Sequence, residues 1–522
     1  MRPEATYAGS VVRSALDPLR RPVSTAAPTR PAEPSPVTVR DVLRDPRRLR
    51  IEVLAGLVVA LALIPEAISF SVIAGVDPRV GLFASFTMAV TIAFVGGRPA
   101  MISAATGAIA LVVAPVVREH GLDYLVATVL LGGLIQVVLA VLGVAKLMRF
   151  VPRSVMVGFV NALAILIAAA QLPNVVGVPW LVYPMVAVGI AVIVLLPRVT
   201  TVVPSPLVAI VLLTAVTLLV GLSVPNVGDE GALPDSLPSL FTPDVPLSLE
   251  TLRIIGPYAL AMALVGLMES LMTATLVDDI TDTRSSKTRE AWGQGVANLV
   301  TGAFGGMGGC AMIGQTMINV RASGARTRLS TFLAGTFLLV LVVVLGDVVA
   351  LIPMAALVAV MVMVAVGTFD WHSVRPATLR RMPYSETAVM LSTVVVTVAT
   401  SNLAIGVVVG VLVAMVAFAR RVAGFTRVEE VSHDEHTRVY RVVGELFFAS
   451  SNELVHRFDY AGDPPHVVID LSESHVWDAS TVAALDAVDQ RYAARGTTVE
   501  IRGLNQASQE RRDRLSGAFG GG

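Results

Sequence analysis

The sequence predicts an α-helical polytopic membrane protein, a 7+7 transmembrane inverted repeat followed by a small α/β domain. Composition is the first observation, because 54% of the residues are hydrophobic and only 15% are charged. In soluble domains roughly 45–50% of the residues are apolar and about 25% are charged. The second observation is that the apolar segments fall into two sets of seven. The third is that the first segment of each set carries a glutamate near its middle.

A polar, proline-rich stretch from Pro225 to Glu250 separates the two sets. We predict a transmembrane domain over 45–424, with repeat one at 51–223 and repeat two at 254–420. An odd number of crossings in each repeat turns the second repeat upside down in the membrane, as in inverted-repeat transporters. The predicted segments are 51–75, 80–96, 102–117, 124–147, 154–172, 181–197 and 205–223, then 254–278, 290–305, 311–320, 328–350, 351–367, 384–400 and 403–420.

The distribution of basic residues agrees with this topology. Connections rich in Lys and Arg face the cytoplasm. Arg47 and Arg48 precede the first segment, and the even-numbered connections hold further clusters such as 284–289 and 375–381. The long connection between the two sets is acidic instead. We therefore expect a multi-pass protein of the cell (plasma) membrane with both termini in the cytoplasm.

The two ends of the chain differ from the apolar middle. Residues 1–44 are rich in Pro, Ala and Arg, which predicts a disordered cytoplasmic tail. Residues 425–522 alternate strand-like and helix-like segments, which predicts a small α/β domain. In that domain Asp478 and Ser480 lie at a predicted strand-to-helix turn, where either side chain would cap the helix.

Glu66 and Glu269 occupy matching places in the two repeats, 269 − 66 = 203 residues apart. An ionisable side chain at membrane depth costs at least about 2.5–3.5 kcal/mol on insertion scales. Such a residue is rarely kept without a function. The pair therefore predicts a polar site at the interface between the repeats.

The third segment of each repeat is unusual. The stretches 103–108 and 310–315 each follow a pair of glycines, and each begins a predicted helical run with small residues. Both segments are short for a crossing, which needs about 20 residues. Interrupted segments at corresponding places point to a transporter's midplane site. Two half-helices entering from opposite faces would aim their positive ends at one point, which would bind an anion.

Several motifs resemble the sulfate permease (SulP) family, whose eukaryotic relatives are anion exchangers. The motifs lie at 65–78, 269–271 and 308–319, and the resemblance covers about residues 45–520. It implies a core domain and a gate domain, each drawing on both repeats. It also implies an anion held between the third and tenth helices and moved by an elevator-like displacement, a homodimer, and a cytoplasmic STAS domain at 425–522.

The resemblance and the helix-terminus argument together predict the site residues. For substrate binding these are Ser103, Ala104, Ala105, Thr106, Gly107, Ala311, Met312, Ile313, Gly314, Gln315 and Thr316. For the coupling ion they are Glu269, Glu66 and Thr273. In the STAS-like domain, Ser480 occupies the place of the phosphorylatable serine of bacterial anti-sigma-factor antagonists. The resemblance thus makes Ser480 a candidate regulatory phosphosite and the domain a candidate surface for a cytoplasmic regulator.

Two departures from the family bear on coupling. Many members have Gln where this chain has Glu66, and several animal members have a basic residue where this chain has Gln315. The predicted pocket therefore holds two acidic groups and no fixed positive charge. An anion would be repelled unless at least one carboxyl were protonated, and burial disfavours the charged form. We expect proton-coupled uptake; a sodium-coupled bicarbonate symporter, with ligands from Glu269 and Thr273, is the alternative.

The expected substrate is a small inorganic oxyanion, sulfate first and bicarbonate second. A nucleobase permease of the same architecture is a further alternative, since neutral substrates suit acidic pockets. The sequence shows no nucleophile–base constellation, metal motif or nucleotide loop, so we expect a non-enzymatic secondary active transporter without a cofactor other than its coupling ion. Its expected partners are the anion, the lipid bilayer and a second copy of the chain, with no nucleic acid.

Overall fold

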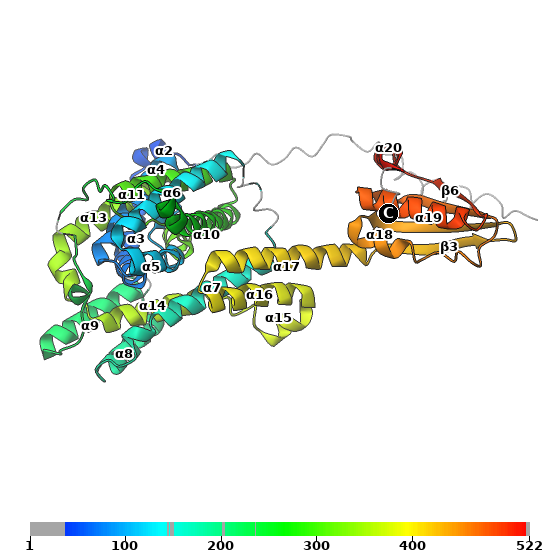
Figure 1. The fold of residues 1–522 in the computed structure, drawn as a ribbon. Coiled ribbons are helices and arrows are strands. Elements are labelled where there is room, and N and C mark those ends of the chain that lie inside the picture. Colours follow the sequence, from blue (N-terminus) through cyan, green and yellow to red (C-terminus); the bar gives the residue numbers. More distant parts are fainter. Residues whose placement is uncertain (1–36, 144–145, 147–150, 201–203, 235, 518–522) are drawn as a thin grey trace, which may run out of the picture.

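The structure, a computed structural model, describes residues 37–143, 146, 151–200, 204–234 and 236–517. It confirms the predicted fold class (Figure 1). Repeat one contains α3 (Pro46–Ala74), α4 (Pro78–Val95), α5 (Gly107–His120), α6 (Leu122–Val141), α7 (Arg153–Ala170), α8 (Val182–Leu195) and α9 (Ser205–Val220). Repeat two contains α10 (Leu249–Thr281), α11 (Lys287–Ala303), α12 (Ile313–Met317), α13 (Arg328–Ala350), α14 (Met354–Thr368), α16 (Tyr384–Thr400) and α17 (Leu403–Ala423).

These helices differ in hydrophobicity and in length. In the described part of the chain, α3, α4, α6, α7, α10, α13 and α17 are long and apolar enough to cross a bilayer. The shorter apolar helices are α8, α9, α14 and α16. α5 and α12 are the two interrupted segments. α12 continues as a π-helix, η6 (Ile318–Ala322), which brings its helical run only to Ala322.

The helices form two packed groups, and each group draws on both repeats (Figure 1). We call α3, α4, α5, α6, α10, α11, α12 and α13 the core group, and α7, α8, α9, α14, α16 and α17 the flanking group. Equivalent helices make equivalent contacts: α4 packs on α13 as α11 packs on α6, and α7 packs on α16 as α14 packs on α8. Each repeat is therefore completed by the other.

Two short strands join the repeats at the centre of the core group. β1 (Ser103–Ala104) pairs antiparallel with β2 (Cys310–Ala311), with Ser103 opposite Ala311 and Ala104 opposite Cys310. The N–H of Met312 also donates to the carbonyl of Ile102 at 2.9 Å. Because each strand leads directly into a short helix and the strands are antiparallel, α5 and α12 leave the pair in opposite directions.

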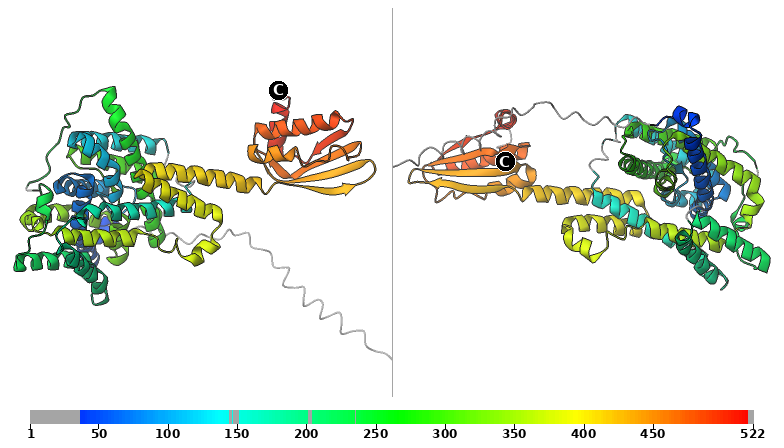
Figure 2. Two further views of the ribbon diagram at one scale, coloured as in Figure 1. Left: turned by 60° about the horizontal axis from the view of Figure 1, so that its bottom comes forward. Right: turned by 180° about the vertical axis from the view of Figure 1, so that it is seen from behind.

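The C-terminal domain lies at the far end of α17, which extends out of the helical bundle (Figures 1 and 2). Its sheet has the order β3-β4-β5-β6, with β3 antiparallel to β4 and the other neighbours parallel. α19 packs Val482, Leu485 and Val488 into the buried core. The elements are β3 (Arg427–His433), β4 (Thr437–Leu446), α18 (Phe448–Leu454), β5 (His466–Val476), α19 (Ala479–Ala493), β6 (Thr498–Arg502) and α20 (Gln506–Leu515).

Two local predictions need correction. The tail prediction for 1–44 mostly lies outside the described residues, but its last part is wrong because Val39–Arg44 form a helix, α2, capped by the Thr38 side chain. The helical runs predicted from 103 and 310 begin later, at Gly107 and Ile313. The small residues before them instead form strands, since opposing main chains can pair there without side chains in the way.

The strand pair is especially sensitive to substitution at Gly309. A Cβ there would collide with the main-chain oxygen of Ala104. We expect Gly309→Ala to cost about 1–3 kcal/mol through overpacking and to lower the melting temperature of the purified protein. The control is Gly256→Ala in α10, where a Cβ meets nothing within 4 Å. Equal melting temperatures for the two variants would contradict the tight strand packing.

Candidate functional site

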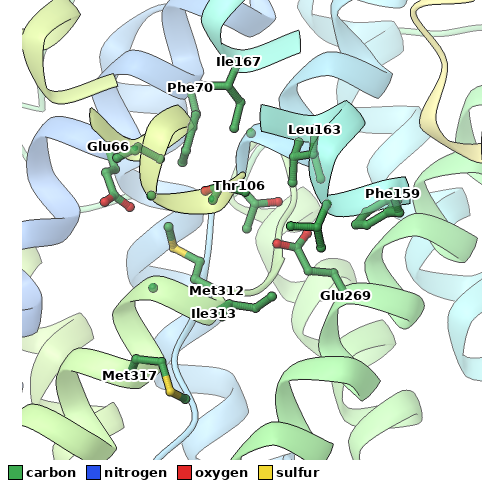
Figure 3. A pocket seen from close by; sticks show the side chains of 17 residues that line it. Glu66, Phe70, Thr106, Phe159, Leu163, Ile167, Glu269, Met312, Ile313 and Met317 are labelled. Carbon is green, nitrogen blue, oxygen red and sulfur yellow. The ribbon is translucent and has the colours of Figure 1, made fainter. Parts of the chain in front are cut away.

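A cavity of about 420 Å³ lies where the core group meets the flanking group. The first turns of α5 and α12 form part of its wall through Gly107 and Gly314, and α3 and α10 contribute the two glutamates (Figure 3). α7 and α14 of the flanking group close the remaining sides, mostly with apolar residues. The lining residues are Glu66, Phe70, Thr106, Gly107, Ala108, Phe159, Val160, Leu163, Ile167, Glu269, Met312, Ile313, Gly314, Met317, Val364, Gly367 and Thr368.

The helix starts at this cavity are suited to an anion. The first N–H groups of a helix have no partner within it, and the end carries roughly half a positive charge. The Thr106 side chain caps α5 by accepting from the N–H of Ile109 at 3.4 Å, whereas the Met312 side chain makes no capping hydrogen bond to α12. A Cβ on Gly314 would meet nothing within 4 Å, so the main chain of α12 is open to the cavity.

Glu269 is connected to the start of α5 through Cys310. The Cys310 thiol donates to Oε2 of Glu269 at 3.0 Å, and its sulfur lies 3.1 Å from the Thr106 hydroxyl. Cys310 is fully buried and Glu269 is only 7% exposed. Figure 3 shows the Glu269 carboxylate directed toward Thr106. A change in the proton on Glu269 therefore acts on hydrogen bonds at a helix terminus that lines the cavity.

Glu66 has a separate partner, Gln315 of α12. Its Oε1 accepts from Nε2 of Gln315 at 2.8 Å. The Gln315 Oε1 is buried without a hydrogen-bond partner among the described residues. A half-turn of the amide would let that oxygen accept from a protonated Glu66. The pair can thus satisfy either form of the carboxyl.

The structure brings together part of the predicted substrate set. Thr106, Gly107, Met312, Ile313 and Gly314 line the cavity together with Glu66 and Glu269. Gln315 does not line it but holds Glu66 in place. The predicted role of these residues as substrate or coupling-ion contacts stays a prediction.

Other predicted residues lie behind the cavity wall. The main chain of Ala104 and Ala311 is engaged in the strand pair. The Ser103 hydroxyl accepts from Gln294 at 2.7 Å, and the Ala105 N–H donates to Ser85. Strand pairing and buried contacts use the polar groups of Ser103, Ala104, Ala105 and Ala311, and none of the four lines the cavity.

Thr316 and Thr273 also face away from the cavity lining. The Thr316 hydroxyl accepts from the N–H of Ile102 at 3.0 Å, and it is fully buried. The Thr273 hydroxyl donates to the main-chain oxygen of Glu269 at 2.8 Å. Both hydroxyls are therefore engaged by main-chain groups, and neither residue is among those that line the cavity.

Sequence reasoning named neither Cys310 nor the apolar wall as part of the site. Phe70 of α3 and Phe159, Leu163 and Ile167 of α7 border the cavity. Spacing alone could not find them, since an apolar residue facing a cavity resembles one facing lipid. The signal that was available for Cys310 was its place at the start of the interrupted segment. Within the described ranges, no group of three or more His, Cys, Asp or Glu side chains could hold a metal ion.

Comparison with known proteins identifies the family to which this chain belongs. Residues 49–188 and 180–393 match the sulfate permease family, and 429–516 match the STAS domain. The chain therefore belongs to the sulfate permease family and carries a STAS domain. This family membership confirms the resemblance inferred from the motifs.

Individual relatives agree with the family assignment. YbaR of Bacillus subtilis (strain 168), whose name assigns it sulfate transport provisionally, is 54% identical over 463 residues, covering 88% of this chain and 96% of YbaR. The bicarbonate transporter BicA of Picosynechococcus sp. is 26% identical over 499 residues, covering 85% of this chain and 87% of BicA.

Solved structures show the same architecture. The transmembrane domain of a cyanobacterium bicarbonate transporter BicA superposes with a TM-score of 0.62 at 25% identity, covering 70% of this chain and 97% of that one. Murine Solute Carrier 26 family member A9, an anion transporter in the inward-facing state, gives a TM-score of 0.76, covering 100% of this chain and 96% of that one. At 15% identity the second likeness concerns the fold alone.

Within the STAS domain, Asp478 provides the helix cap. Its Oδ1 accepts from the N–H of Thr481 at 3.0 Å, and its Oδ2 accepts from the N–H of Phe448 at 2.6 Å. Ser480 is exposed in the first turn of α19. Its predicted role as a regulatory phosphosite stays a prediction, with an accessible hydroxyl at a helix N-terminus in its favour.

Proposed function

We propose that this chain is a secondary active transporter of an inorganic oxyanion, with sulfate the first candidate and bicarbonate the second. The observation that carries the proposal is the meeting of the α5 and α12 N-termini, through Gly107 and Gly314, at a cavity that also holds Glu66 and Glu269. Main-chain N–H groups at helix starts donate hydrogen bonds to the delocalised oxygens of such anions. The names of YbaR and BicA support the same two substrates.

Electrostatics favour proton coupling. Two helix starts supply roughly one positive charge in total, whereas Glu66 and Glu269, when ionised, supply two negative ones. Two like unit charges 4 Å apart repel by about 4 kcal/mol at an effective dielectric constant of 20. A divalent anion entering between two carboxylates would meet that repulsion several times over. Protonation of at least one carboxyl therefore precedes anion binding, and loss of the proton on the cytoplasmic side releases the anion.

Sodium coupling has less support in the geometry. A sodium site needs several oxygen ligands, and the pair considered from the sequence was Glu269 with Thr273. The Thr273 hydroxyl is buried and directed to the main-chain oxygen of Glu269. The Cys310 thiol donates to one oxygen of the carboxylate, Oε2. A proton needs only one oxygen of Glu269, so it is the coupling ion that we propose.

The position of the cavity supports elevator-type alternating access. Both helix starts and both glutamates belong to the core group, while α7 and α14 of the flanking group provide the opposing wall. Displacement of the core group along that wall would carry the bound anion from one side of the membrane to the other. We further propose a homodimer in the plasma membrane with cytoplasmic termini, and regulation through the STAS domain.

Glu269→Gln tests the coupling role. The amide resembles the protonated carboxyl in shape but cannot release a proton as a carboxyl does. We expect proton-gradient-driven accumulation of labelled sulfate and bicarbonate in proteoliposomes to be lost, while anion exchange across the membrane persists. Glu250→Gln, at an exposed position in the first turn of the same helix, is the control and should accumulate normally. Full accumulation by Glu269→Gln would reject this residue as the coupling group.

Cys310→Ala tests whether the thiol tunes that group. The thiol donates to the carboxylate, and a hydrogen bond to the charged form favours ionisation. Its removal takes this hydrogen bond away, so the pH profile of uptake should differ measurably from that of the unchanged protein. Cys310→Ser, which keeps a donor, is the matched control and should stay near the original profile. Identical pH profiles for all three proteins would show that Cys310 only fills space.

A further inference from the structure

A second cavity, separate from the anion cavity, lies between α3, α9 and α13 and has a volume of about 310 Å³. We call it the lateral groove. Pro65 of α3, Ile210 of α9 and Val349 of α13 are among the residues that line it. α3 and α13 belong to the core group and α9 to the flanking group. The lateral groove is thus a second place where the two groups face each other.

The chemistry of the lateral groove is almost wholly aliphatic. Thr214 is the one polar residue among those that line it, and its hydroxyl is buried without a hydrogen-bond partner in the described part of the chain. A buried water needs two to four polar partners. A single hydroxyl cannot meet that need, so ordered water does not account for this space.

Burial shows in which direction the lateral groove opens. Its floor is inside the protein, with Ile210 4% and Val349 7% exposed. Its rim is on the outside of the helical bundle, with Val211 59% and Val348 56% exposed. Because these residues lie on helices that cross the membrane or pack beside such helices, the open side faces the bilayer. α13 departs from helical geometry at Leu345, another lining residue, with φ −107° and ψ 18°.

We propose that the lateral groove binds one acyl chain of a bilayer phospholipid. An empty apolar groove leaves its wall atoms without dispersion contacts on one side, and a hydrocarbon chain restores them. Phospholipid chains are the bulk component of the medium at the open side. The lining residues include no charged group, so the groove selects an aliphatic chain rather than a headgroup.

An acyl chain in this place would contact both helix groups. Pro65 lines the lateral groove, and the next residue, Glu66, lines the anion cavity. Pro65 also cannot donate the usual helical hydrogen bond to the carbonyl of Leu61, which lines the same groove. The occupied groove therefore supports α3 at a point where its own hydrogen bonding is interrupted.

Photo-crosslinking tests the site without reference to transport. Purified full-length protein is reconstituted with a phosphatidylcholine that carries a diazirine in one acyl chain, irradiated, and mapped by mass spectrometry. We expect labelling to concentrate on the α3, α9 and α13 residues of the lateral groove. Ala215→Trp and Thr214→Phe place larger side chains at its rim and floor. Each should lower groove labelling by roughly tenfold, equivalent to about 1.4 kcal/mol.

The control is Leu219→Trp, on the same helix, 87% exposed and outside the lateral groove. It should leave groove labelling unchanged. Labelling spread evenly over exposed apolar residues, or insensitive to both Ala215→Trp and Thr214→Phe in folded protein, would overturn the proposal. Because the readout is covalent labelling, either result is independent of whether the chain carries sulfate or bicarbonate.

Discussion

The pairing of β1 with β2 is the contact on which the rest of the site depends. Only two residues from each strand take part, yet they fix where α5 and α12 begin and send the two helices in opposite directions. Without this pairing, no contact would hold two positive helix ends close together inside an apolar protein. Small residues make it possible, because Gly309 and Ala104 bring main chains together at a distance that no larger side chain permits.

The carboxyl groups add negative charge to a site where the helix starts supply only positive charge. Helix termini attract an anion at any pH. A site with attraction alone would not release the bound anion. In the proposed mechanism, Glu269 and Glu66 oppose anion binding when ionised and allow it when protonated, so that the same cavity would load and unload. In that mechanism, the hydrogen bond from Cys310 and the amide of Gln315 would set how readily each carboxyl changes form. The proposed mechanism depends on these two contacts.

The sequence was sufficient for the architecture and for about half of the site. Membrane crossings follow from hydropathy, and matched glutamates at equivalent depth identified the two acidic positions without any coordinates. The exact use of residues 103–105 and 311 could not be predicted, because a small residue before a helix serves equally as strand or as first turn. The long-range hydrogen bond of Thr316 to Ile102 joins residues 214 apart in sequence, which no local pattern encodes. The apolar wall from α7 was likewise invisible, since only tertiary packing distinguishes a cavity-facing Phe159 from a lipid-facing one.

The most direct test of the account is to locate the anion itself. Selenate has the shape and charge of sulfate and scatters anomalously, so crystals grown with selenate would give an anomalous peak at each bound position. We expect a peak inside the cavity, within hydrogen-bonding distance of main-chain N–H groups at the starts of both α5 and α12 and close to Glu269. A peak on only one helix start, or one outside this cavity with the cavity vacant, would contradict it.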